Sequence, residues 1–310
     1  MTRRETEPER GQMARPEGER VGFVGLGTMG TPMVTRLVRA GYDVVLHDAD
    51  PARTTQLADE LAGAGTVAAA TDPGDLASCT VIVTMLPTST VVRSVLLDDG
   101  ALRIPLGPGA VVVDMSSSDP TETVETGRML AAHEVVMVDA PVSGARERAA
   151  AGTLAIMLGS DDEAAAERAI PVVETMSRSV YRTGKLGTGH AMKALNNFVA
   201  GAAFAATSEA LTAGMRFGLD PQVMVDVLDD STGQSFITSH VLGPHVVEGR
   251  FASGFSLPLL TKDVRIAHEL QGAVGHHAPV CDAVTTALGG ALDALGDVDH
   301  TEAFRFWQER

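Results

Sequence analysis

The alternation of apolar runs with amphipathic stretches limits what this chain can fold into. From Val21 to about Gly184, short runs rich in Val and Ile alternate with longer Ala-rich stretches, which is typical of strand–helix–strand units in a parallel sheet. After Gly184, Ala, Leu and Met recur at helical spacing, and a long helix is expected over about 188–217. The sequence therefore predicts a doubly wound α/β domain followed by an all-α domain. The expected strands are VGFVGL, YDVVLHD, CTVIVTML, AVVVDM, EVVMVDAPV, TLAIMLGS and SVYRTG.

Length and glycine content place the domain boundaries. The chain has 310 residues, enough for two domains of ordinary size, and the segment GKLGTG has three glycines just before the long helix. The first twenty residues hold five Arg and five Glu and no apolar stretch, which predicts a disordered, solvated tail and neither a secretory signal nor a membrane anchor. We expect this tail over 1–20, the doubly wound domain over 21–184 and the helical domain over 185–310, interrupted at Gly243 and Pro244.

The charge balance excludes several classes of partner. Lys and Arg number 24 against 40 Asp and Glu, a net charge of −16, which disfavours nucleic acid and anionic membranes. No stretch of ~18 uninterrupted apolar residues is present, so no membrane span is expected. Cys79 and Cys281 are predicted to be reduced, packed thiols, and the nine histidines show no metal-ligand spacing. A cytoplasmic protein without a bound metal is expected, in which a few local groups capture any anionic ligand.

A glycine-rich turn follows the first expected strand. Gly25, Gly27 and Gly30 form G-x-G-x-x-G before a helix that is expected to run to about Arg39. This pattern is typical of Rossmann-type domains, in which the glycines allow a tight turn, a close approach of pyrophosphate and close helix packing. The helix N-terminus then supplies N–H groups to the phosphates. The expected cofactor-binding segment is Gly25, Leu26, Gly27, Thr28, Met29 and Gly30.

An acidic residue at the end of the second expected strand indicates which dinucleotide binds. Asp48 lies 23 positions after Gly25, where a carboxylate accepts the ribose hydroxyls and repels a 2′-phosphate. NAD is therefore favoured, while NADP is not excluded because Arg53 lies just beyond and an arginine there can hold a 2′-phosphate. Alternatively, Asp48 only caps the following turn with Asp50 and Pro51.

An ordered series of motifs resembles the β-hydroxyacid dehydrogenase family, which includes 3-hydroxyisobutyrate, tartronate semialdehyde and threonate dehydrogenases. The motifs occur in the family's order and spacing over about residues 21–300, so the resemblance covers nearly all of the chain. They are GFVGLGTMGTPM, TMLP, DMSSSDP, DAPVSGA, GTGHAMKALNNF and LTKD.

The resemblance implies a substrate-carboxylate pocket at Ser143, Gly144 and Ala145. A serine hydroxyl and exposed N–H groups in a glycine-containing turn can bind a small anion without a net positive charge, although the same residues also fit an ordinary strand-ending turn. The family usually has a second glycine where this chain has Ala145. Arg146, which follows, could add a positive charge for a different anion.

The resemblance also assigns the chemistry to the long helix, with Lys193 as the catalytic lysine and Asn197 as its substrate-orienting partner. Asn197 lies four residues on, so both side chains share one helix face. Oxidation of an alcohol requires a group that removes the hydroxyl proton, and the reverse reaction requires one that donates it. Burial near a positive nicotinamide is expected to lower the pKa of such a lysine. Without the resemblance, Lys193 also fits a lysine whose stem covers an apolar surface.

Further cofactor and substrate contacts follow from the same resemblance. It places Lys262 in the cleft, Asp263 as the residue that orients it, and Ser117 near the nicotinamide. It also places Leu86 and Pro87 along the cofactor. By themselves, Lys262 and Asp263 are equally typical of a solvated helix face.

The expected function is hydride transfer between a small anionic 3-hydroxy acid, similar to 3-hydroxyisobutyrate, and NAD, with a lysine as general acid and base. Two alternatives remain: a reductase of a small semialdehyde that uses NADPH, and a non-catalytic cofactor-binding module. A 6-phosphogluconate dehydrogenase type is disfavoured by the short helical domain and by Ala200, and an imine reductase by Lys193. Because the long helix is apolar, a homodimer or homotetramer is expected.

Overall fold

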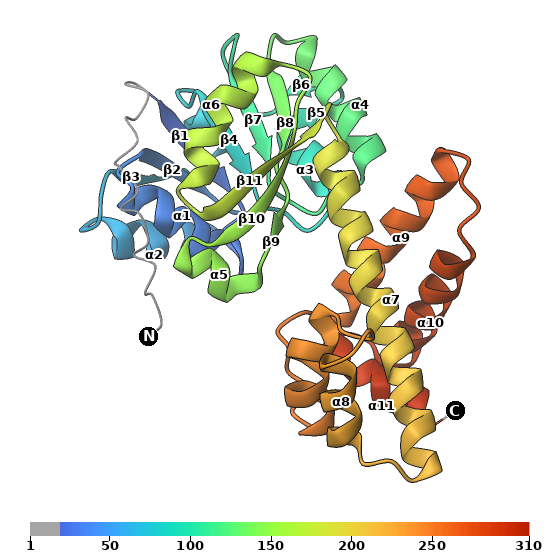
Figure 1. Ribbon diagram of the computed structural model, residues 1–310. Helices are drawn as coiled ribbons and strands as arrows, with labels where there is room; N and C mark the ends of the chain where they lie inside the picture. Colours follow the sequence, from blue (N-terminus) through green and yellow to red (C-terminus); the bar gives the residue numbers. More distant parts are fainter. Residues whose placement is uncertain (1–18, 310) are drawn as a thin grey trace, which may run out of the picture.

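The computed structural model describes residues 19–309, which form a sheet-containing domain and a helical domain joined by one long helix (Figure 1). Most of the expected N-terminal tail lies outside the described residues. The tail was predicted to extend too far, because Arg20 already begins strand β1 and Glu19 pairs with Arg168 at 2.8 Å.

A nine-stranded sheet forms the centre of the first domain, in the order β11-β10-β8-β7-β4-β1-β2-β3, with β9 paired to β10. Every pairing is parallel except those of β10 with β8 and β9. The strands are β1 Arg20–Val24, β2 Asp43–His47, β3 Val67–Ala69, β4 Val81–Thr84, β7 Val111–Asp114, β8 Val136–Asp139, β9 Val142–Ser143, β10 Leu154–Gly159 and β11 Ser177–Gly184; a separate hairpin joins β5 Leu97–Asp98 and β6 Ala101–Leu102.

The sheet departs from the expected parallel pattern at β10. A parallel crossover needs about a dozen residues or more, and the link between β9 and β10 holds only the short helix α5 Ala145–Ala151. The chain consequently returns antiparallel, and the segment expected as one strand, EVVMVDAPV, is divided into β8 and β9.

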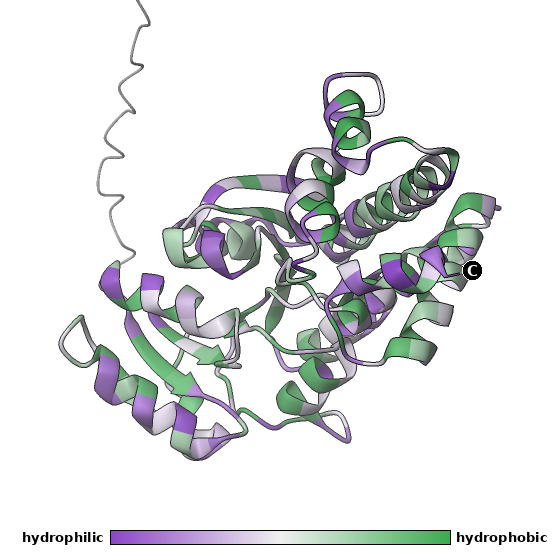
Figure 2. Cartoon of the chain, turned by 90° about the horizontal axis from the view of Figure 1, so that it is seen from below, coloured by the Kyte–Doolittle hydropathy of each residue, from purple (hydrophilic) through white to green (hydrophobic). Residues whose placement is uncertain are grey.

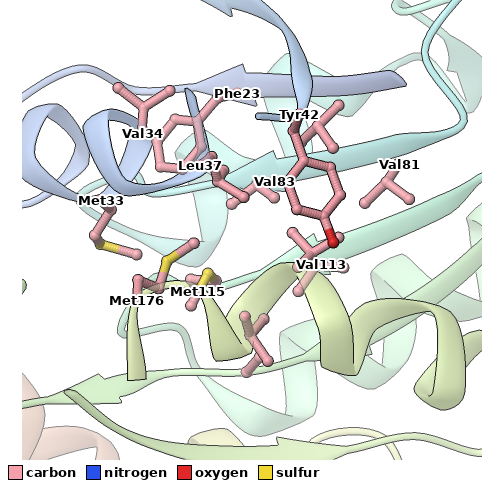
Figure 3. Packing of buried hydrophobic residues seen from close by; sticks show 14 of the residues in the cluster. Phe23, Met33, Val34, Leu37, Tyr42, Val81, Val83, Val113, Met115 and Met176 are labelled. Carbon is pink, nitrogen blue, oxygen red and sulfur yellow. The ribbon is translucent and has the colours of Figure 1, made fainter. Parts of the chain in front are cut away.

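Helices cover both faces of the sheet, as a doubly wound domain requires. Val21 and Phe23 point into one core with α1, α2 and α6, while Val24 points into the other with α3 and α4, as the alternation of strand side chains dictates. Figure 3 shows the first core, where Phe23, Leu37 and Val83 lie close together. Hydrophilic and hydrophobic residues alternate along the helices (Figure 2).

The helices of this domain, besides α5, are α1 Gly30–Arg39, α2 Pro51–Leu61, the 3₁₀ turn η1 Pro73–Leu76, α3 Ser89–Leu96, α4 Pro120–Ala131 and α6 Glu163–Glu174.

The helical domain is built around α7 Thr188–Phe217, whose bounds match the expected helix. Phe204 and Leu211 of α7 pack in its core with residues of the later helices. A π-helix, η2, runs through Gly243 and Pro244, so the predicted interruption there is wrong. The other elements are α8 Pro221–Asp229, η2 Thr238–Val247, α9 Leu257–Ala273, α10 Pro279–Leu295, η3 His300–Glu302 and α11 Ala303–Gln308.

By length and composition alone, α7 could cross a membrane, with a mean hydropathy of 1.2 over 18 residues. It is not an uninterrupted apolar stretch, because Lys193, Glu209 and Arg216 lie within it, and a single helix of this kind is weak evidence for a membrane span. In the structure, α7 packs against β10, β11, α9, α10 and α11.

Candidate active site

The glycine-rich turn lies between β1 and α1 as the motif predicts. Gly25 has a φ of +100°, a conformation that favours glycine. A Cβ on Gly30 would lie under 3.0 Å from the Gly25 carbonyl oxygen, whereas a Cβ on Gly27 would have no neighbour within 4 Å. Gly27 and Thr28 are exposed, Met29 precedes the helix as its N-cap, and Leu26 is buried. The turn therefore leaves open backbone at Gly27, where a pyrophosphate fits.

Asp48 is oriented toward this turn. Its Oδ2 accepts a hydrogen bond from the Leu26 N–H at 2.7 Å, and its Oδ1 accepts one from the Asp50 N–H at 3.0 Å. Asp48 does cap the following turn through the Asp50 N–H, while Asp50 is the N-cap of α2; the second Asp48 oxygen also binds the glycine-rich turn, so capping is not all that this carboxylate does. Arg53 Nη1 lies 3.7 Å from Asp48 Oδ1. The Arg53 guanidinium is therefore paired with this carboxylate.

Lys193 lies in the second turn of α7 and is half-buried. Its ammonium has no hydrogen bond or ion pair with any residue of 19–309. Burial lowers the pKa of Lys193; the nearby carboxylate of Asp263 opposes this shift, and the charge of Lys262 adds to it. The structure therefore provides an amine whose pKa is lowered by burial and which has no hydrogen-bond or ion-pair partner among the described residues.

Asp263 of α9 binds Asn197, the residue expected to work with Lys193. Its carboxylate is only 3% exposed, and its Oδ2 accepts a hydrogen bond from Asn197 Nδ2 at 2.6 Å. Asn196 Nδ2 in turn donates to Asn197 Oδ1 at 3.1 Å. These contacts fix the Asn197 amide on the α7 face that carries Lys193.

Lys262 is not a solvated surface residue. Its Nζ donates to the Ser117 carbonyl oxygen at 2.6 Å and to the Pro87 carbonyl oxygen at 3.3 Å, and lies 3.2 Å from Asp263 Oδ1. The side chain thus connects α9 to the loops after β4 and β7. The Lys262 amine is hydrogen-bonded, which distinguishes it from that of Lys193.

A hollow of about 280 Å³ lies beside Lys262 and is lined in part by Thr88, Ser117 and Arg265. The Leu86 N–H donates a hydrogen bond to Ser116 Oγ at 2.9 Å in the same region.

The predicted carboxylate pocket is a strained turn. Ser143 ends β9, and its hydroxyl has no hydrogen-bond partner among the described residues. Gly144 has a φ of +143° and Ala145 a φ of +55°, where a side chain is disfavoured. The backbone therefore keeps a conformation that suits glycine although this chain has alanine. Arg146 is exposed, and the stem of Arg148 packs over Gly144.

Some residues received no role in the sequence interpretation. Asp114 lies in the quoted motif DMSSSDP, Asp139 in DAPVSGA and His190 in GTGHAMKALNNF; all three are buried together where α7 meets the sheet. The available signal was an aspartate at the end of each of two neighbouring strands. Among residues 19–309, no group of three or more His, Cys, Asp or Glu side chains is arranged so that it could hold a metal ion, and Cys79 and Cys281 are buried free thiols.

The fold and the glycine-rich turn define an NAD(P)-binding protein with a doubly wound domain and a helical domain. A family model described as the NAD binding domain of 6-phosphogluconate dehydrogenase matches residues 20–184. A second, described as NAD-binding of NADP-dependent 3-hydroxyisobutyrate dehydrogenase, matches residues 187–307. The chain belongs to the β-hydroxyacid dehydrogenase family of oxidoreductases.

Individual relatives cover almost the whole chain. The 2-(hydroxymethyl)glutarate dehydrogenase of Eubacterium barkeri is 32% identical over 94% of this chain and 95% of its own length. A probable 3-hydroxyisobutyrate dehydrogenase of Mycobacterium tuberculosis is 35% identical over 84% of this chain and 88% of its own. The solved structure of Mycobacterium tuberculosis 3-hydroxyisobutyrate dehydrogenase with L-serine has a TM-score of 0.83 at 32% identity, covering 93% and 99% of the two chains.

Proposed function

We propose that this protein transfers a hydride between a small 3-hydroxy acid and NAD, with Lys193 as general acid and base. The observation that carries the proposal is the partnerless, pKa-lowered amine of Lys193 beside the fixed pair of Asn197 and Asp263. Relatives named for 3-hydroxyisobutyrate and 2-(hydroxymethyl)glutarate support the substrate class.

The residues divide the work between binding and proton transfer. The Ser143 hydroxyl and the N–H groups of the turn at Gly144 and Ala145 bind the substrate carboxylate. Asn197 orients the alcohol, and neutral Lys193 accepts the hydroxyl proton on Nζ; in the reverse direction the ammonium donates it. The bound nicotinamide supplies the hydride acceptor. Lys262 holds the loops at Pro87 and Ser117 against α9 and so helps to close the cleft around the reacting groups.

The preference for NAD follows from Asp48. Its carboxylate lies at the glycine-rich turn and carries a negative charge that repels a 2′-phosphate. Arg53 is 3.7 Å from this carboxylate and is therefore partly neutralised as a phosphate ligand. The alternative, semialdehyde reduction with NADPH, requires Arg53 to leave Asp48.

A substrate panel tests the proposal. Small 3-hydroxy acids, with one and with two carboxylates, are incubated with NAD or NADP while absorbance at the reduced nicotinamide band is recorded. The proposal expects turnover with NAD and a lower kcat/KM with NADP. A rise in melting temperature with NAD, without oxidation of any hydroxy acid or reduction of any semialdehyde, would instead indicate a non-catalytic cofactor-binding module.

The pH profile of alcohol oxidation should depend on Asp263. Oxidation needs neutral Lys193, so kcat should rise with pH and level off above the lowered pKa of this lysine. Asp263 raises that pKa, so Asp263→Asn should move the rise to lower pH, while the amide oxygen can still accept from Asn197. The measurement is kcat against pH for both proteins. A rise that stays in place or moves to higher pH would contradict the assignment.

Association and location belong to the same proposal. Val199 and Phe217 on α7 are 64% and 88% exposed, which favours burial against a second copy in a homodimer or homotetramer. The small anionic substrate is the only other partner proposed, and the proposed location is the cytoplasm.

A further inference from the structure

Three ionisable side chains are buried where the sheet meets α7, outside the proposed reacting groups. Asp114 ends β7, Asp139 ends β8, and His190 lies in the first turn of α7; their exposed fractions are 0%, 0% and 1%. Burying two carboxylates together is costly unless each is compensated. Apolar side chains would avoid this cost, so we expect the Asp114–His190–Asp139 cluster to have a structural role that apolar side chains could not fill.

Asp139 caps α7 from the sheet. The residue before the helix is Gly187, which has no side chain to cap it. Asp139 Oδ1 accepts a hydrogen bond from the Gly187 N–H at 2.7 Å, and Oδ2 accepts one from the His190 N–H at 2.8 Å. Burial raises the pKa of Asp139, whereas His190 and these two N–H groups lower it. One carboxylate thus satisfies two of the unpaired donors of the helix start.

The start of α7 has no free space to shift toward the sheet. A Cβ on Gly189 would lie under 3.0 Å from the Met157 carbonyl oxygen and from Asp139 Oδ2, and a Cβ on Gly159 would collide with Asp139 Oδ1. Glycines at both places let helix and sheet approach this closely. The first turn of α7 therefore lies close against the sheet, beside Asp139.

His190 links the same turn to two more elements. The Thr123 hydroxyl of α4 donates its single hydrogen to the Asp119 carbonyl oxygen at 2.8 Å. In its 2.9 Å contact with His190 Nδ1, the ring nitrogen must therefore be the donor. Nε2 then faces Asp114 Oδ2 at 3.7 Å without a hydrogen-bond partner. The ring lies between the two carboxylates and joins α4 and β7 to α7.

Asp114 is held rigidly by its own partners. It accepts hydrogen bonds from Thr84 Oγ1 at 2.8 Å, from the Ser116 N–H at 3.0 Å and from Ser118 Oγ at 2.8 Å. Ser116 also accepts the Leu86 N–H at 2.9 Å. The cluster is thus continuous with the loop expected along the cofactor.

Lys193 lies three residues after His190, which places it about 4.5 Å further along the helix axis. We infer that the Asp114–His190–Asp139 cluster fixes the first turn of α7 and thereby places the Lys193 amine against the cofactor edge of the sheet. Asp139 and His190 are accordingly positioning residues. This inference rests on the proposed function of Lys193, because a misplacement of about 1 Å can cost ~10²-fold in rate.

The test compares Asp139→Asn with a matched cap in the helical domain. Asn cannot accept from both N–H groups, so kcat should fall by about 10- to 100-fold, while KM for NAD stays within about twofold because the glycine-rich turn is unchanged. The control is Asp220→Asn: Asp220 caps α8 by accepting from the N–H groups of Gln222 and Val223 at 2.9 and 3.0 Å. Its kcat should match that of the wild type.

A second readout does not depend on turnover. Limited acetylation, mapped by mass spectrometry, reports the reactivity of Lys193 relative to exposed Lys185. Asp139→Asn should change this ratio and Asp220→Asn should not. His190→Gln, which keeps an N–H donor for Thr123, should show the same changes to a smaller degree and serves if Asp139→Asn does not fold.

The outcomes separate this inference from the proposed function. Wild-type kcat and unchanged Lys193 reactivity in folded Asp139→Asn or His190→Gln would overturn the inference, as would an equal loss in Asp220→Asn. If the wild-type protein oxidises no hydroxy acid, the proposed function fails, and the acetylation ratio alone decides whether the cluster places Lys193.

Discussion

Lys193→Ala should lower kcat for alcohol oxidation by about 10²- to 10⁴-fold, the usual contribution of a general acid or base. No other amine can replace it at the site, because Lys262, the neighbouring lysine, already donates to Ser117 and Pro87. NAD should still bind, since the glycine-rich turn and Asp48 are in the other domain. The measurements are reduced-nicotinamide absorbance for turnover and the NAD-induced shift in melting temperature for binding.

Two variants control this experiment. Lys185→Ala removes an exposed lysine from the loop before the same helix and should leave kcat unchanged. Lys193→Arg keeps the positive charge but cannot release a proton near neutral pH, so it should be as inactive as Lys193→Ala. If either Lys193 variant retained more than about a tenth of the wild-type kcat, the general-base role would be rejected.

The parts of the fold that could be predicted depend on local signals. The bounds of α7 follow from its helical spacing and from the glycines at 187 and 218 that bracket it. The glycine-rich turn likewise follows from three glycines with their strand and helix. The antiparallel return at β10 could not be predicted in the same way. It depends on the division of the preceding apolar run into two strands, because only that division makes the link after Ser143 too short for a parallel crossover.

The unpredicted parts of the candidate site depend on contacts between distant residues. Asp139 holds backbone N–H groups that are 48 and 51 positions away, and Lys262 reaches a carbonyl oxygen 145 positions away. A local sequence pattern does not reveal contacts over such sequence separations. From the sequence, the role of an aspartate at a strand end and the role of a Lys–Asp pair therefore each had more than one interpretation. The resemblance to a family supplied the residues to consider, and the geometry distinguished an engaged lysine from a partnerless one.

Gly27→Ala and Gly30→Ala should separate cofactor binding from folding. The space next to Gly27 is empty within the protein, and its φ is not in the left-handed region. An added methyl group should therefore change the free energy of unfolding by no more than about 0.5 kcal/mol. The methyl group would occupy the place where the pyrophosphate approaches the backbone. We therefore expect the binding free energy of NAD to weaken by about 1.4 kcal/mol or more, which is at least a tenfold lower affinity.

Gly30→Ala acts on the protein itself, because its Cβ would collide with the Gly25 carbonyl oxygen. We expect it to lower the free energy of unfolding by about 1–3 kcal/mol, the usual cost of overpacking, in addition to weakening NAD binding. Gly63→Ala, which also has empty space around it and lies in the turn after α2, is the control for a neutral glycine substitution. Denaturant unfolding and NAD titration of the three variants provide the comparison. If Gly27→Ala bound NAD as tightly as Gly63→Ala does, the dinucleotide would have to bind elsewhere.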